Sequence, residues 1–110
     1  MNINAILSED YQLLTNTMML NREFHQVYAG DLLSIVMKSA SKGCTLITVI
    51  SNLNTIAVAV LLEIPAIIIT ENQTITQAMI DKANEESVAL FKTSLKTHEV
   101  IIDFKNRGLL

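Results

Sequence analysis

The sequence predicts an α/β fold, a three-layer αβα sandwich around a mainly parallel sheet of four to five strands. Two continuous apolar and β-branched runs, Cys44–Ile50 and Ala66–Thr70, have the composition of strands that are covered on both faces. Helical segments of about ten residues alternate with the strands, an order that implies right-handed crossovers and helices on both faces of the sheet. No repeat or Pro/Gly-rich linker interrupts the 110 residues. One domain over residues 1–110 is therefore expected.

The first part of the chain predicts short elements. Ile3–Leu7 can form one short helix, and Tyr11–Leu14 can form a strand that is followed by a polar turn around Asn16. The apolar triplet Met18–Leu20 beside this turn is either a partner contact or a piece of core that the first helix covers. Glu23–Tyr28 alternates polar and apolar residues, which predicts a half-buried strand.

The next elements are a helix, a buried strand and a second helix. Asp31 can cap a helix that runs over Leu32–Met37 and that Gly43 closes. The buried strand at residues 44–50 follows directly. Ser51–Asn54 then supplies several N-caps for a helix over Thr55–Leu62, whose alanines allow it to lie close to a sheet.

The same alternation continues to the end of the chain. After the strand over Ala66–Thr70, Thr74 and Gln77 make a capping-box pattern that opens a helix. Ser87–Phe91 is expected to be a third buried strand. Periodic apolar residues then predict a last helix that stops at Gly108.

Charge and hydropathy exclude several classes of function. The chain has 8 Lys plus Arg against 11 Asp plus Glu, and no basic cluster that could neutralise successive phosphates, so nucleic acid is not expected as a partner. The most apolar stretch, Ile56–Ile69, is broken by Glu63 and Pro65 and is too short to span a bilayer. The N-terminus lacks the pattern of a signal peptide, and the lone Cys44 is typical of a reducing compartment. A soluble, cytoplasmic protein without a membrane partner is expected.

A homodimer is expected from the excess of apolar residues. The mean hydropathy of +0.38 is high for a small domain, which has little interior to hold apolar side chains. The helical segments Leu32–Met37 and Val100–Phe104 carry more apolar surface than one buried stripe requires. A symmetric dimer could bury the remainder.

Candidate ligand-binding residues follow the predicted strands, because ligands of open α/β sheets collect beyond the carboxyl ends of strands. The candidates are Asp31, Ser51, Asn52, Asn54, Thr70, Glu71, Asn72, Thr93 and Ser94. Asn54 is the strongest of them, since it lies at the start of a helix. The alternative is that all these residues are caps and turn residues, which every such loop needs.

No catalytic, cofactor-binding or metal-binding constellation can be assembled. The sequence has no Gly-rich phosphate loop, and His25 and His98 have no ligand neighbours at metal-site spacing. Cys44 opens a buried strand, where a thiol behaves as a small apolar group. A hydrolase or transferase would need a pair such as Asp31 with Ser51.

Three segments together resemble a DRTGG domain: Val27–Ser34 (VYAGDLLS), Leu53–Ala59 (LNTIAVA) and Ile67–Thr70 (IIIT). The resemblance extends over nearly the whole chain. DRTGG domains are similar to the N-terminal region of HPr-kinase-type serine kinases, and similar domains occur in some phosphotransacetylases and between the CBS modules of some pyrophosphatases. In those proteins the chemistry belongs to other domains. The resemblance therefore implies a regulatory or assembly module, and it transfers no catalytic residue.

The sequence departs from the family pattern at one loop. Glu71-Asn72 stands where many members have a Gly-Gly turn. Without glycine, the backbone is expected to approach a bound group less closely.

The function expected from the sequence is that of a stand-alone, non-catalytic regulatory or assembly module that modulates a metabolic enzyme or a signalling partner. One alternative is a sensor of a small ligand, such as a nucleotide, that binds at the carboxyl ends of the strands. The other alternative is a small hydrolase or transferase.

Overall fold

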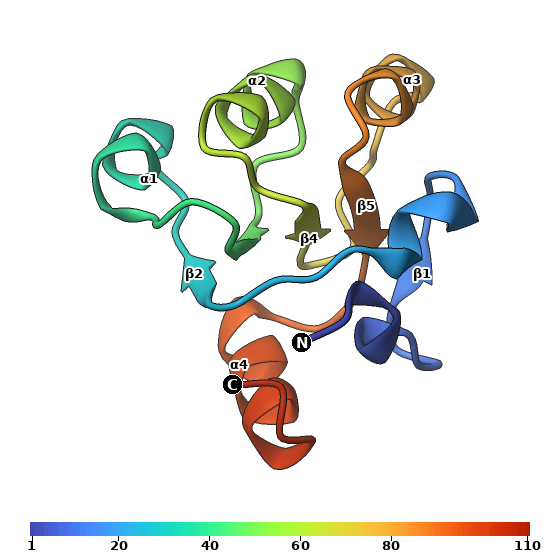
Figure 1. The fold of residues 1–110 in the computed structure, drawn as a ribbon, viewed down its shortest axis with the longest axis vertical. Helices are drawn as coiled ribbons and strands as arrows, with labels where there is room; N and C mark the ends of the chain where they lie inside the picture. Colours follow the sequence, from blue (N-terminus) through green and yellow to red (C-terminus); the bar gives the residue numbers. More distant parts are fainter.

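The computed structural model describes residues 1–110 and contains one five-stranded sheet in the order β1-β5-β4-β3-β2 (Figure 1). The strands are β1 (Gln12–Leu13), β2 (Val27–Ala29), β3 (Thr45–Thr48), β4 (Ala66–Ile69) and β5 (Ala89–Lys92). Strands β2 to β5 are parallel, and β1 pairs with β5 in the antiparallel sense. The predicted α/β class with a mainly parallel sheet is confirmed.

Helices cover both faces of the sheet. The helices are α1 (Leu33–Ser39), α2 (Leu53–Leu61), α3 (Gln77–Glu85) and α4 (Thr97–Asn106), with short 3₁₀ helices η1 (Ile3–Ile6) and η2 (Thr17–Asn21). Helices α1, α2 and α3 form one layer, and α4 lies on the other side of the sheet with the N-terminal segment (Figure 1). The three-layer prediction is therefore also confirmed.

Alternation of side chains along the strands explains why both faces are apolar. On β4, Ile67 and Ile69 belong to the core under α1, α2 and α3, whereas Ile68 belongs to the core on the α4 side. All four residues of β3 and all four of β4 are buried. A continuous apolar run is the pattern that such a doubly covered strand needs.

The N-terminal segment builds much of the core on the α4 side. Ile3, Ile6 and Phe24 are buried there against α4. The triplet Met18–Leu20 is divided: Met19 is buried in this core, Leu20 is half-buried and Met18 is exposed. The core interpretation is thus right for Met19 and wrong for Met18.

The expected end of the first long helix is wrong. Helix α1 ends at Ser39 with Ala40 at its C-cap, and Gly43, with φ 77°, lies in the turn that follows.

Two expected N-caps are also wrong. Helix α1 has Leu32 at its N-cap and no side-chain cap hydrogen bond, because the Asp31 carboxylate accepts hydrogen bonds from the end of β3 instead. Helix α3 is capped by Thr76, whose hydroxyl accepts from the Met79 amide at 3.2 Å, and not by Thr74. The chain before α3 is held at the sheet edge by backbone hydrogen bonds to the loop after β5, so the helix begins later.

The expected excess of apolar surface on α4 is confirmed only in part: Ile102 is exposed by 55%, whereas two other apolar residues of the segment are not exposed. Val100 and Phe104 are fully buried in the core of their own chain, because α4 packs on the sheet through these residues. They are not free for a dimer interface. In α1, by contrast, Ile35 and Met37 are exposed.

None of the helices combines the length and the apolar composition that crossing a bilayer would require.

Candidate functional site

The loops after β2, β3, β4 and β5 meet at one edge of the sheet, as parallel strands require. Two open hollows lie at this edge. The larger one, the edge cleft, has a volume of about 620 Å³. It is lined by Asp31, Glu71, Lys96, Thr97, His98, Ile101 and Ile102.

The second hollow, with a volume of about 350 Å³, lies at the start of α2. It is lined by Ser51, Asn52, Leu53, Asn54 and Thr76. The structure therefore separates the predicted residues into two groups instead of one constellation. Among the other candidates, Asn72 and Ser94 are exposed outside both hollows, and Thr70 and Thr93 are buried.

Asp31 connects two neighbouring loops. Its Oδ1 atom accepts hydrogen bonds from the Thr48 hydroxyl at 3.1 Å and from the Val49 amide at 2.8 Å. The carboxylate thus ties the loop after β2 to the end of β3, while the residue still lines the edge cleft. The expected N-capping role of Asp31 is replaced by this connection between two loops.

Buried threonines end three adjacent strands. The Thr48 hydroxyl donates to Asp31 and accepts from the Ile50 amide at 3.2 Å. The Thr93 hydroxyl accepts from the Leu95 amide at 3.1 Å. The Thr70 and Thr97 hydroxyls lie 3.1 Å apart and share a hydrogen bond, so Thr70 holds the first turn of α4 against the sheet. These hydroxyls organise the loops that form the edge.

The loop after β4 keeps a left-handed backbone without glycine. Glu71 has φ 61° and Asn72 has φ 54°. Their amides donate to the carbonyls of Leu95 and Thr93, each at 2.9 Å. These hydrogen bonds hold a conformation that costs an L-residue about 1–2 kcal/mol, less for asparagine than for glutamate. The turn conformation that glycine favours is therefore present, with a Cβ atom at both positions.

The capping interpretation is confirmed for Asn52. Its side chain accepts from the Asn54 amide at 2.9 Å and begins α2. The side chain of Asn54 is exposed beside it, at the rim of the second hollow. Ser51 is half-buried in the same hollow, and the Asp31 carboxylate is bonded to Thr48 and Val49, so the two residues do not form an acid and nucleophile pair.

The first turn of α4 is the part of the edge cleft that the sequence analysis missed. Lys96, Thr97 and His98 line the cleft together with Ile101. The Lys96 amide donates to the Glu99 carboxylate at 2.8 Å, which closes the start of the helix. Lysine is not a favoured N-cap, so capping patterns did not point to this turn. The available signal was topological, since a helix after a parallel strand begins at the same sheet edge.

The edge cleft has mixed charge. Asp31 and Glu71 contribute two carboxylates, Lys96 contributes an ammonium group, and His98 contributes an imidazole. No three His, Cys, Asp or Glu side chains lie close enough together to hold a metal ion. Burial raises the pKa of the Cys44 thiol, which lies in the core and away from the cleft.

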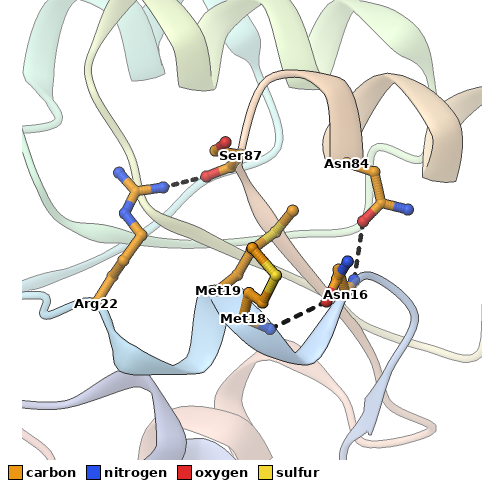
Figure 2. Close-up of a pocket in the computed structure, with 6 residues that line it drawn as sticks. All are labelled: Asn16, Met18, Met19, Arg22, Asn84 and Ser87. Atoms are coloured by element: carbon orange, nitrogen blue, oxygen red, sulfur yellow. Dashed lines mark hydrogen bonds between the residues drawn. The ribbon is translucent and has the colours of Figure 1, made fainter.

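A smaller hollow of about 230 Å³ lies near the amino end of β5 (Figure 2). There the guanidinium of Arg22 donates to the Ser87 carbonyl, and the Asn84 side chain accepts from the Asn16 amide at 2.8 Å. Both side chains are engaged with backbone groups and join the N-terminal segment to α3 and to the turn before β5 (Figure 2). The polar side chains of this hollow therefore have a structural role, because they connect neighbouring segments of the fold.

Comparison with known proteins finds a matching family model and similar solved structures. Residues 44–106, more than half of the chain, match the family model described as HPr Serine kinase N terminus. The fold is similar to that in the crystal structure of the CBS and DRTGG domains of the regulatory region of Clostridium perfringens pyrophosphatase, complexed with the activator diadenosine tetraphosphate. That match has a TM-score of 0.72 and 13% sequence identity, and it covers 91% of this chain and 46% of the other. No curated protein matches the chain.

The matched segment runs from β3 through α4 and so includes the loops after β3, β4 and β5. At 13% identity the structural similarity shows the shared fold. The resemblance inferred from the three sequence segments agrees with both matches. This chain belongs to the family of HPr serine kinase N-terminal domains.

Proposed function

We propose that this chain is a non-catalytic regulatory or assembly module that acts in the cytoplasm as a homodimer and modulates a metabolic enzyme or a signalling partner. One observation carries the proposal. The polar side chains that end the parallel strands are bonded to neighbouring loops, with Asp31 on Thr48 and Val49, and Thr70 on Thr97. Side chains that are bonded in this way fix the conformation of the loops, and they do not serve as a nucleophile or a base.

Family membership supports the same function. The structure with the matching fold is described as part of a regulatory region, and the chain spans 46% of its length. Covalent catalysis would need an activated nucleophile with a base in hydrogen-bond reach. The only thiol, Cys44, is buried, and Asp31 and Ser51 line different hollows.

The experiment begins with the purified protein. Light scattering at micromolar concentration is expected to give about twice the monomer mass of 12.2 kDa. The activity of an enzyme that co-purifies with the chain from its own host is then measured while the purified chain is added. A saturable change at fixed stoichiometry is expected. Turnover of a substrate by the purified chain alone would contradict the non-catalytic function, and a 12.2 kDa species would contradict the dimer.

A second candidate function is favoured by the edge cleft. Its volume of about 620 Å³ lies in the range of small-molecule sites, about 300–1,000 Å³. Ile101 offers an apolar wall for a base, and Lys96 at the start of α4 offers a positive charge for a phosphate. The regulatory region of the pyrophosphatase was crystallised with a nucleotide activator. A nucleotide sensor is therefore the alternative function that we propose for this site.

Thermal-shift measurements with diadenosine tetraphosphate, ATP and AMP test the sensor function. Binding in the edge cleft should raise the melting temperature, and Lys96→Ala should abolish this rise. Asn54→Ala serves as the matched control, because Asn54 lines only the second hollow. Loss of the rise in Asn54→Ala alone would move the site to the start of α2. No shift with any of the three nucleotides would reject the nucleotide sensor.

A further inference from the structure

Helix α2 has apolar residues on both of its faces and contains no charged residue. Its inner face, with Ile56 and Ala59 among others, is buried against the sheet. Leu53, Val60 and Leu61 on its outer face are exposed by 50%, 41% and 65%, and Ala57 between them is exposed as well. A helix that is apolar all round is normally covered all round.

The neighbouring helix α3 has charged residues on its solvent-exposed face, in contrast to α2. Helices α1, α2 and α3 lie in one layer with α2 in the middle (Figure 1). The exposed positions of α3 include Asp81, Lys82 and Glu85. Lys82 forms ion pairs with Glu85 at 3.7 Å and with Glu86 at 3.2 Å. The two helices differ in their outer residues although they share a layer, so the apolar outer face of α2 does not follow from its position alone.

The apolar surface continues onto α1, which packs beside α2. Six of the eleven exposed large hydrophobic side chains of the protein belong to α1, its N-cap and α2. They are Leu32, Ile35, Met37, Leu53, Val60 and Leu61. A stable interface of standard size buries ~800 Å² on each partner, which three side chains of α2 alone do not supply, so the residues of α1 extend the area available to a dimer.

We propose that a second copy of this chain covers the outer face of α2, with the two α2 helices packed antiparallel across a two-fold axis at Ala57. The spacing of the exposed residues along α2 supports this antiparallel geometry. Leu53 and Leu61 each lie four residues from Ala57, so a two-fold axis at Ala57 exchanges them, while the same axis sets Val60 against Asn54 of the other copy. An antiparallel two-fold therefore sets Leu53 of one copy against Leu61 of the other, twice, as an isologous interface requires.

Two further features favour this pairing. The small side chain of Ala57 at the centre allows the helix axes to approach within about 8–10 Å. The antiparallel arrangement also sets the amino end of each α2 beside the carboxyl end of its partner, so the helix dipoles attract each other. Helix α2 carries no charged residue, so packing α2 against α2 buries no charge of this helix.

This inference rests on the homodimer of the proposed function and adds the surface that forms it. Leu61→Glu tests the surface, because Leu61 is largely exposed in a single chain and the variant should fold. We expect the dissociation constant of the dimer to rise at least about 100-fold, since a buried charge is introduced twice. Met18→Glu introduces the same charge at an exposed methionine outside the α1 and α2 surface and should leave the dimer unchanged.

Disulfide trapping gives a second measurement that does not depend on the fold of Leu61→Glu. Cα atoms lie about 2.3 Å from a helix axis, so the Ala57 Cα atoms of the two copies should be about 4–5 Å apart, within reach of a disulfide. Ala57→Cys should therefore form a covalent dimer under mild oxidation. Ala78→Cys, at an exposed alanine of α3, should not. Cys44 is buried and does not compete.

The outcomes separate the surface from the function. A wild-type dimer that persists in Leu61→Glu, without trapping through Ala57→Cys, would overturn the α2 surface and leave the homodimer intact. A monomeric wild-type chain would reject both the homodimer and the pairing of α2 with a second copy. Dissociation by Leu61→Glu together with trapping at Ala57→Cys would support the proposal.

Discussion

The carboxylate of Asp31, which follows β2, accepts a hydrogen bond of 3.1 Å from the buried hydroxyl of Thr48 at the end of β3. The same oxygen accepts from the Val49 amide at 2.8 Å. The Asp31 carboxylate thus joins the loop after β2 to the end of β3 at the edge cleft, and it does not cap a helix.

Replacement of Asp31 should therefore destabilise the fold. We expect Asp31→Ala to lower the free energy of unfolding by about 1–3 kcal/mol, because the Thr48 hydroxyl loses its acceptor in a buried position. Asp31→Asn keeps one acceptor oxygen and should lose less. Urea unfolding at neutral pH measures both. An equal loss in the two variants would contradict the role of this hydrogen bond.

The hydroxyl of Thr45 is the one buried side-chain polar atom without a hydrogen-bond partner. Thr45→Val replaces this hydroxyl by a methyl group of similar shape and should stabilise the protein by about 1 kcal/mol. The melting temperature should rise by roughly 4–8 °C. Thr48→Val is the matched control on the same strand and should destabilise, because the Thr48 hydroxyl has two partners.

Glu71 has a left-handed backbone that glycine adopts without penalty. Glu71→Gly should raise the free energy of unfolding by roughly 0.5–1 kcal/mol, since relief of the backbone cost exceeds the entropy gained by the unfolded chain. Glu71→Ala retains the Cβ atom and should show no such gain. Asn72→Gly should gain less than Glu71→Gly, because asparagine tolerates this conformation. Equal stability of the glycine and alanine variants at position 71 would refute the argument.

Tyr11 makes stability sensitive to high pH. Burial and a hydrogen bond of 2.8 Å to the Asp103 carboxylate raise the pKa of its hydroxyl above the usual value of 10, although Arg107 acts in the opposite direction. The folded state thus favours the neutral phenol. Its contribution to stability is complete below pH 10 and is lost as the pH rises above 10.

Comparison with Tyr11→Phe isolates this contribution. The variant keeps the ring that packs edge-on against Phe104 and removes the titrating hydroxyl. Between pH 8 and pH 11 the free energy of unfolding of the wild type should therefore fall more than that of Tyr11→Phe. Urea unfolding across this range measures the difference. Parallel pH profiles of the two proteins would rule out a titration of Tyr11.

Much of the fold could be predicted from local composition. Cys44–Ile50 and Ala66–Thr70 are continuous runs of apolar and β-branched residues, so they indicated doubly covered strands, and β3 and β4 lie within them. Gly108, with φ 74°, ends the last helix where the sequence predicted. Local patterns succeeded because these features depend on the residue itself and its nearest neighbours.

The sequence by itself determined the alternation of strands and helices, the apolar interior and the family, because hydrophobic period and turn chemistry are local properties. Only the tertiary structure decided which polar residues meet. In the folded protein Asp31 bonds Thr48 and does not cap α1, and Lys96 and His98 lie at the edge cleft. The apolar outer residues of α2 are exposed to solvent. Such partners are distant in the chain, and they are chosen by how the layers pack.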